Sequence, residues 1–127
     1  MLETRALPAP KFRYAPAVEA GPFIRTAGLV GLDPAAGELV PGGAAAEFEQ
    51  IMTMLFGLME DNALSLKDLV SATLYVTDFD DFPKINAVWE RFVPAGGPLP
   101  ARTAVGVSAL PLGAAVEAEF MLMKDQN

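Results

Sequence analysis

Segment 114–123 constrains the fold more than any other segment, because it alternates like a strand and yet carries apolar residues on both faces. One face presents four apolar side chains: Val116, Ala118, Phe120 and Leu122. The other face presents two acidic residues followed by two methionines: Glu117, Glu119, Met121 and Met123. A strand with one face in water normally places apolar residues on its inner face alone. We therefore expect this strand to belong to a sheet that is covered on both sides.

Two further segments show the spacing of amphipathic helices. Apolar residues recur at helical intervals over about 44–62 and again over about 80–92. Asn62 is expected to adopt a left-handed conformation and to stop the first helix. Three glutamates of this helix fall outside its apolar stripe: Glu47, Glu49 and Glu60.

Strands are predicted over 22–31, 69–79, 102–108 and 114–123, and Asp33-Pro34 with Gly37 indicates a loop or hairpin over 32–39. The order β, β, α, β, α, β, β is typical of an α+β fold in which the helices pack on one face of a mixed sheet. The second face of such a sheet needs another cover. Because 52% of the residues are hydrophobic and only 20% are charged, we expect other subunits to supply that cover.

The length of 127 residues predicts one domain, 1–127, whose prolines favour an extended N-terminal arm over 1–16. The net charge is −7, and the nine Lys and Arg residues are scattered along the chain. Nucleic-acid binding requires a basic patch that neutralises phosphates, so no nucleic-acid partner is expected.

The absence of cysteine and histidine limits the chemistry. Disulfides, thiol nucleophiles, Ser–His and Cys–His pairs and the usual zinc sites are excluded. The longest uncharged stretch, 103–116, is too short to span a membrane and is broken by Gly and Pro. The N-terminus lacks the apolar segment of a signal peptide, so we expect a cytoplasmic protein without a membrane partner.

Arg102 and Glu117 are the charged residues that the apolar strands leave unexplained. Arg102 shares one strand face with three very small residues, at positions 104, 106 and 108. Either Arg102 binds a carboxylate bidentately in a small pocket while Glu117 handles a water molecule, or the two form an ion pair that holds strands in register, within the chain or across an interface. If their strands are antiparallel neighbours, the two residues fall near opposite ends.

Three other polar residues have alternative interpretations. Glu119 either forms an acid–base pair with Glu117 or belongs with it to a solvated edge. Asn86 lies on the apolar stripe of the second helix, where we expect it to hydrogen-bond the backbone. Tyr14 either caps a pocket or packs the N-terminal arm against the body of the protein.

Three long segments resemble one known family. They are "GLVGLDPAAGELV", "LVSATLYVTDFDDFPKINAVWERFV" and, without a gap, "PARTAVGVSALPLGAAVEAEF". Over about residues 14–123 the chain resembles the RidA/YjgF family, whose older names are L-PSP endoribonuclease and translation inhibitor. The resemblance implies a Bacillus chorismate mutase-like fold, with a mixed sheet of about six strands and two helices on one face. It also implies a homotrimer whose sheets face inward, with ligand clefts between subunits.

The resemblance implies an activity and a set of site residues. Archetypal members hydrolyse reactive enamines and imines, such as 2-aminoacrylate, to a 2-keto acid and ammonia, without a cofactor or metal. Arg102 matches the arginine that binds the substrate carboxylate, and Glu117 matches the glutamate that positions the attacking water. Five further positions match substrate-binding residues of the family: Tyr14, Ala27, Gly28, Asn86 and Ala104.

Two of these positions depart from the family pattern. Ala27 replaces a serine and Ala104 replaces a cysteine or small polar residue, which predicts a more apolar cleft and a larger or less polar imine. The alternative function is a non-enzymatic module that binds small carboxylates such as 2-keto acids. Arg102 serves both functions, whereas hydrolysis alone requires Glu117. An RNA-acting role is disfavoured, because the chain has no basic run and no histidine pair for phosphodiester cleavage.

Overall fold

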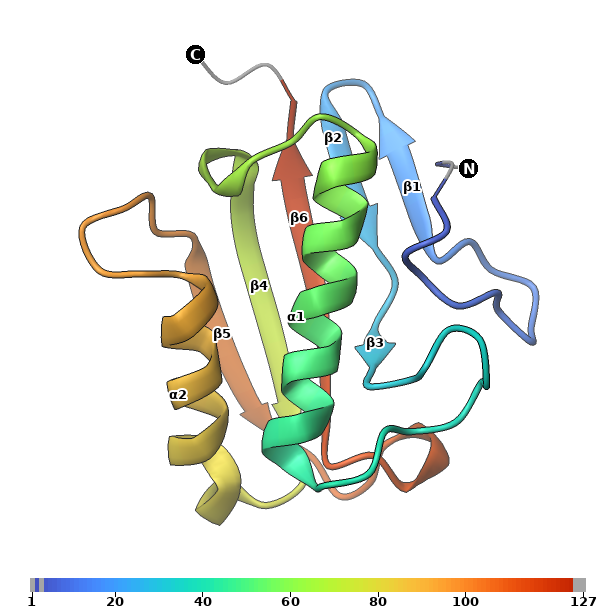
Figure 1. Ribbon diagram of the computed structural model, residues 1–127, viewed down its shortest axis with the longest axis vertical. Coiled ribbons are helices and arrows are strands. Elements are labelled where there is room, and N and C mark those ends of the chain that lie inside the picture. The colour runs from blue at the N-terminus through green and yellow to red at the C-terminus, as the bar shows by residue number, and fades with distance from the viewer. Residues whose placement is uncertain (1, 3, 125–127) are drawn as a thin grey trace.

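The computed structural model describes residues 2 and 4–124 and has two layers, a sheet and a pair of helices (Figure 1). The helices are α1 (Ala44–Asp61) and α2 (Phe82–Phe92). The strands are β1 (Ala17–Ala20), β2 (Phe23–Thr26), β3 (Leu29–Val30), β4 (Leu69–Val76), β5 (Ala101–Gly106) and β6 (Val116–Met123). Short 3-10 turns occupy Leu66–Asp68, Phe79–Asp81 and Pro111–Gly113. The α+β prediction is confirmed.

The sheet is mixed, with the order β1-β2-β6-β4-β5 and β3 also paired to β6. The one parallel pair among the strand pairings described is β4 with β5, which α2 connects. A crossover helix is the usual connection between parallel neighbours. Strands β5 and β6 are therefore not neighbours, because β4 lies between them. The strands that carry Arg102 and Glu117 thus do not form the antiparallel pair that the sequence analysis considered.

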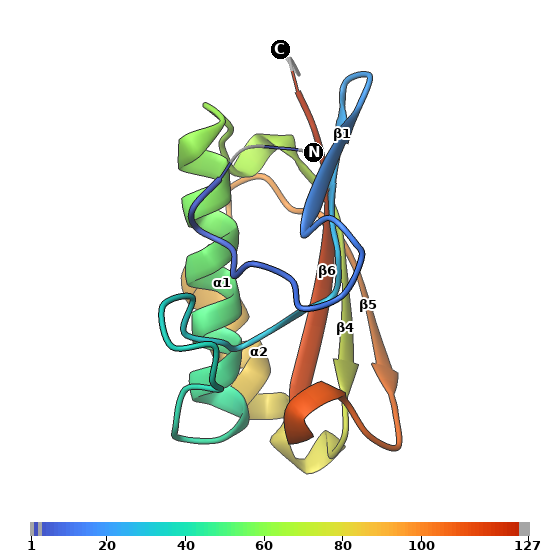
Figure 2. The same ribbon diagram turned by 90° about the vertical axis from the view of Figure 1, so that its right-hand side faces the viewer.

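The core lies between the helices and the inner face of the sheet (Figure 2). Alternate residues of the two central strands point into it and are fully or almost fully buried: Ala72, Leu74, Val76, Val116, Ala118, Phe120 and Leu122. The helices contribute large buried side chains: Phe48, Ile51, Leu55 and Leu58 from α1, and Ile85, Val88 and Trp89 from α2. In the part of the chain that the structure describes, no helix combines the length and hydrophobicity that crossing a membrane requires.

The outer face of the sheet carries the remaining alternate residues and has no helix over it (Figure 2). Three large apolar side chains there are substantially exposed: Val18 (43%), Phe23 (42%) and Val105 (39%). The expectation of a sheet covered on both faces is thus met on one side by the helices. Cover on the other side requires something beyond the described residues of one chain.

The single strand predicted over 22–31 is wrong, because the structure breaks it into β2 and β3. Arg25 pairs with Met121 and Leu29 with Ala118, so four steps on one strand oppose three on β6. The extra residue is a bulge, which bends the strand and interrupts the backbone ladder. At this break the buried Thr26 hydroxyl accepts a hydrogen bond from the Phe120 N–H at 3.0 Å.

Replacement of Thr26 by valine is expected to lower the free energy of unfolding by about 1–3 kcal/mol, because the buried N–H of Phe120 loses its acceptor. Urea unfolding at fixed protein concentration measures the change. Thr53→Val is the matched control, since the Thr53 hydroxyl is exposed and donates only to the Glu49 carbonyl of its own helix. An equal loss of stability in both variants would contradict the assignment.

Two details of α1 differ from the sequence predictions. Asn62 is not left-handed (φ −118°); its side chain donates to the Leu58 carbonyl, and Ala63 takes the positive φ (54°) instead. Glu47, which falls outside the predicted apolar stripe, is buried (7% exposed), and its carboxylate accepts a hydrogen bond from the Ala115 N–H at 2.9 Å. The cause in both cases is tertiary packing at the ends of the helix, which the helical period does not encode.

Candidate functional site

Arg102 is held by three side chains of α2. Its guanidinium carbon lies 5.1 Å from the centre of the Trp89 ring and 5.4 Å from that of Phe82. One guanidinium nitrogen donates to Asn86 Oδ1 at 2.9 Å. Residues 82, 86 and 89 share one face of a helix, since they are four and three positions apart. The cation–π contacts and the hydrogen bond thus fix the position of the guanidinium beside the edge strand β5.

In this environment the positive charge of Arg102 is available to bind an anionic ligand. Among the described residues, Arg102 has no carboxylate partner, and its one hydrogen bond is to the neutral Asn86. A guanidinium has several further N–H donors in a planar fork that matches a carboxylate. An ion pair between Arg102 and Glu117 is therefore absent from the described part of one chain. The predicted hydrogen bond from Asn86 to the backbone is also wrong. Within the described residues, the one hydrogen bond of the Asn86 side chain is the one that its Oδ1 accepts from Arg102.

Glu117 lies on the outer face of the sheet beside the bulge. A Cβ atom added to Gly28 would lie only 2.6 Å from Glu117 Oε1, so the missing side chain at residue 28 makes room for this carboxylate. Burial raises the pKa of Glu117 above its usual range, and the charge of Glu119 raises that pKa further. Within the described residues the Glu117 carboxylate makes no hydrogen bond.

Glu119, two residues further along β6, has the opposite electrostatic environment. Its carboxylate accepts from the Tyr75 hydroxyl and forms an ion pair with Arg25 at 2.6 Å. These two hydrogen bonds lower the pKa of Glu119. The bond to Glu119 in turn raises the pKa of Tyr75. Two neighbouring carboxyl groups with pKa values pushed apart are a common arrangement at acid–base sites.

Glu119→Gln is expected to lower the pKa of Glu117, because it removes the negative charge that helps to raise it. That pKa should stay above the ordinary glutamate range, since burial is the larger cause. Titration of the Glu117 side-chain carbon by NMR in both proteins measures the shift. An unchanged or higher Glu117 pKa in the variant would show that the two carboxylates are not coupled.

Arg102 and Glu117 lie on opposite faces of the sheet. Arg102 faces α2, and its partner on the neighbouring strand β4 is Ala72, which is buried on the inner face. The partner of Glu117 on β4 is Tyr75, which lies on the outer face. One chain therefore does not bring both side chains to one small molecule. Because side chains alternate strictly along a strand, no change of rotamer moves either residue to the other face.

The other predicted site residues divide between these two places. Gly28 and Ala27 lie with Glu117 at the bulge, where the Ala27 N–H donates to the Pro16 carbonyl at 2.8 Å. Ala104 lies on β5 two residues after Arg102 and is exposed, and Asn86 contacts Arg102 directly.

Tyr14 is in the arm that precedes β1 and is 53% exposed. Within the described residues its hydroxyl has no hydrogen-bond partner, so one chain supports neither a pocket cap nor a packing contact through that group.

The sequence analysis missed four residues that complete these clusters: Phe82 and Trp89 around Arg102, and Arg25 and Tyr75 around Glu119. Phe82 and Trp89 belong to the apolar stripe predicted over 80–92, and Asn86 between them is the only sequence signal that this stripe also contacts a polar group. Arg25 and Tyr75 gave no signal, because their contact with Glu119 depends on the order of the strands.

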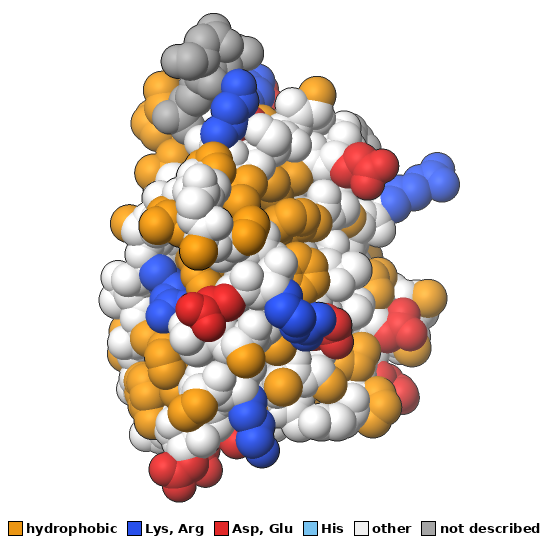
Figure 3. Space-filling view, turned by 60° about the vertical axis from the view of Figure 1, so that its left-hand side comes forward, with side chains coloured by type: hydrophobic (Ala, Val, Ile, Leu, Met, Phe, Trp, Pro, Cys, Tyr) orange, Lys and Arg blue, Asp and Glu red, His pale blue; other side chains and the backbone are white. Residues whose placement is uncertain are grey.

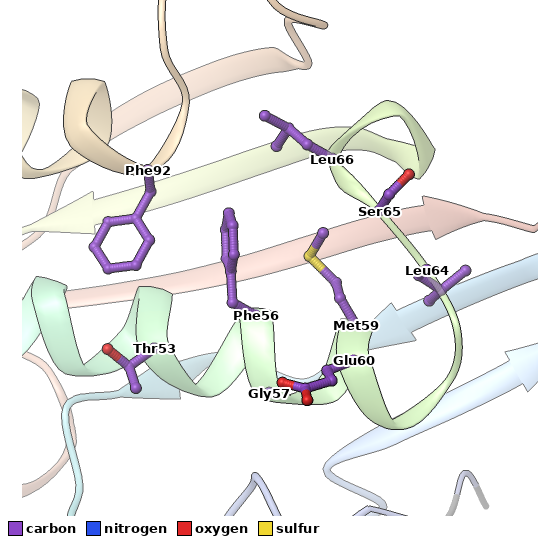
Figure 4. A pocket seen from close by; sticks show the side chains of 9 residues that line it. All are labelled: Thr53, Phe56, Gly57, Met59, Glu60, Leu64, Ser65, Leu66 and Phe92. Atoms are coloured by element: carbon purple, nitrogen blue, oxygen red, sulfur yellow. The ribbon is translucent and has the colours of Figure 1, made fainter.

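A separate hollow of about 610 Å³ lies on the helical side, between α1, the end of α2 and the Leu66–Asp68 turn (Figure 4). Its lining is mostly apolar and includes Phe56 and Phe92, whose rings meet edge to face at 5.2 Å. Neither Arg102 nor Glu117 lines it. Glu60 is the one charged lining residue, so the hollow lacks the paired groups that acid–base chemistry requires.

Comparison with known proteins places the chain in a family. The family model described as Endoribonuclease L-PSP matches residues 4–123. The chain belongs to the L-PSP family. A mouse relative named 2-iminobutanoate/2-iminopropanoate deaminase is 35% identical over 124 residues, which are 98% of this chain and 90% of the relative. A RutC family protein of Pyrococcus abyssi is 34% identical over 122 residues, 96% of this chain and 94% of that protein.

Solved structures agree with this L-PSP assignment. A putative endoribonuclease of Thermotoga maritima is 33% identical, with a TM-score of 0.88 over 98% of this chain and 96% of that one. The E. coli protein TdcF, solved with bound serine, is 25% identical, with a TM-score of 0.89 over 98% of each chain. The proteins similar to this chain thus include one named as an imine deaminase and one solved with bound serine.

Proposed function

We propose that this L-PSP protein hydrolyses 2-imino acids, and the enamines that interconvert with them, to a 2-keto acid and ammonia. The observation that carries the proposal is the Arg102 guanidinium, which three α2 side chains hold in place and which has no carboxylate partner among the described residues. A 2-imino acid presents a carboxylate that fits this fork. The names of the mammalian relatives support the reaction class.

Arg102 binds the substrate carboxylate and orients the adjacent imine carbon. The water oxygen then bonds to that carbon, the π bond to nitrogen breaks, and Glu117 accepts the proton that the water releases. The same carboxyl group returns this proton to the nitrogen, which gives a carbinolamine. It then takes the proton of the new hydroxyl group and passes it to the nitrogen, which leaves as ammonia while the carbon–oxygen double bond forms. A carboxyl group whose pKa is raised by burial holds a proton more readily than an ordinary glutamate, which suits it to these transfers. No cofactor is needed, because the imine carbon is already electrophilic.

The site requires more than one copy of the chain in this proposal. Because Arg102 and Glu117 lie on opposite faces of the sheet, Arg102 of one copy and Glu117 of another contact the same substrate. The exposed apolar side chains of the outer face, including Phe23 and Val105, support its burial against neighbouring copies. A homotrimer with the sheets facing inward satisfies both requirements.

A binding module for 2-keto acids is the second candidate. One observation favours it: the carboxylate-binding cluster around Arg102 is complete in a single chain, whereas Glu117 is not near it. Such a protein would bind the products of imine hydrolysis without accelerating the reaction.

A coupled trapping assay separates the two candidates. An amino-acid oxidase generates imines from a panel of amino acids, and semicarbazide traps whatever imine escapes hydrolysis. The deaminase is expected to reduce semicarbazone formation at concentrations far below that of the imine. Unchanged trapping across the whole panel, together with 2-keto acid binding by calorimetry, would replace the deaminase with the binding module.

A further inference from the structure

We infer that Phe79 and Phe82 form a subsite for the substrate side chain, and that it selects 2-imino acids with aromatic or large apolar side chains. The inference rests on the proposed function, because it takes Arg102 as the group that binds the carboxylate. It adds a substrate class that differs from the small imines named for the mouse relative.

The two rings continue the cluster around Arg102 along β5. The Phe82 ring lies 5.4 Å from the Arg102 guanidinium carbon, and the Phe79 ring follows at 5.5 Å from Phe82. Phe79 then reaches back to the strand at Gly106, where an added Cβ would lie 3.0 Å from its ring. Ala104 lies between Arg102 and Gly106 on the same face of β5, because side chains alternate along a strand. Its methyl group therefore lies on the strip of surface between Arg102 and the two rings.

In a single chain this strip is apolar and exposed to solvent. Phe79 is 47% exposed, although phenylalanine is a residue type that proteins usually bury. Ala104 is exposed as well, and neither it nor Gly106 offers a polar side-chain atom. In Figure 3, which brings the side of the molecule with α2 and β5 forward, hydrophobic side chains lie among basic and acidic ones. A substrate held by its carboxylate on Arg102 extends its side chain over Ala104 against the two rings.

The surrounding charges reject anionic side chains. Asp78, Asp80 and Asp81 flank Phe79 in the chain and lie in or next to its 3-10 turn. A second carboxylate on the substrate would meet these negative charges, while a phenyl or branched alkyl group would bury apolar surface and contact the rings edge to face.

Calorimetric binding of pyruvate, phenylpyruvate and 2-oxoglutarate to the whole protein tests the subsite without turnover. Phenylpyruvate is expected to bind about tenfold more tightly than pyruvate or better, the range that an apolar pocket gives for added apolar groups. 2-Oxoglutarate is expected to bind more weakly than both. Phe79→Ala is expected to remove most of the preference for phenylpyruvate and to leave pyruvate affinity unchanged. Phe79→Leu should retain part of it.

Phe12→Ala is the matched control, because it removes an exposed phenyl group from the N-terminal arm, outside the sheet and α2. It should retain the full preference for phenylpyruvate. Equal wild-type affinity for pyruvate and phenylpyruvate, failure to bind either, or an equal loss of preference in Phe12→Ala would overturn the subsite. A preserved preference with no imine hydrolysis in the trapping assay would overturn the proposed function and leave the subsite standing.

Discussion

Arg102→Ala is expected to lower both the affinity for 2-keto acids and kcat/KM for 2-imino acids by at least about 100-fold. The variant removes two charge-assisted hydrogen bonds worth about 1.5–3 kcal/mol each, and about 1.4 kcal/mol corresponds to a factor of ten. The fold should persist, since Arg102 is only half-buried and has no ion-pair partner among the described residues. Calorimetry and the trapping assay measure the two losses.

Arg91→Ala provides the matched control for this experiment. Arg91 lies on α2, the helix whose side chains contact Arg102, but it pairs with Glu49 in an exposed salt bridge, so its loss should leave binding unchanged. Arg102→Lys should recover part of the affinity, because lysine restores the charge without the planar fork. Binding by Arg102→Ala at the wild-type level would remove the basis of the proposed function.

Glu117→Gln is expected to lower kcat for imine hydrolysis by about 100- to 10,000-fold, the range for loss of a general acid–base group. Affinity for 2-keto acids should change little, because Arg102 makes the main contact with the carboxylate. In the wild-type protein, kcat/KM should fall as the pH decreases through the Glu117 pKa, which burial places above the ordinary glutamate range. Glu60→Gln, at a glutamate remote from Arg102, is expected to retain full activity. Unimpaired turnover by Glu117→Gln would show that another group accepts the proton of the attacking water.

The same variant has a stability consequence with a defined sign. A folded-state pKa above the unfolded value means that protonated Glu117 stabilises the fold, and that this contribution is lost as the pH rises through the folded-state pKa. Above that pKa the ionised side chain therefore destabilises the fold. Glu117→Gln is expected to unfold at the same urea concentration as the wild-type protein or a higher one at pH 7. A marked destabilisation would indicate that the carboxylate makes a stabilising contact.

Much of the fold could be predicted because its signals are local. The apolar period over 44–62 and the β-branched run over 69–79 each specify an element without reference to the rest of the chain. The break between β2 and β3 was not predictable, because the bulge at Thr26 exists only where that strand pairs with β6. The burial of Glu47 was not predictable for the same reason, since its partner, the Ala115 N–H, is 68 residues away.

The candidate site divides in a similar way. The amino-acid sequence is enough to identify the groups available for chemistry, because the chain has no cysteine or histidine and carries Arg102 and Glu117 in apolar strands. The contacts of Arg102 with Trp89, Phe82 and Asn86 follow from the three-dimensional structure, as does the position of Glu117 on the opposite face beside Gly28. Residue type and strand period are local properties. Which strands become neighbours, and which helix covers an edge, depend on the packing of the whole chain.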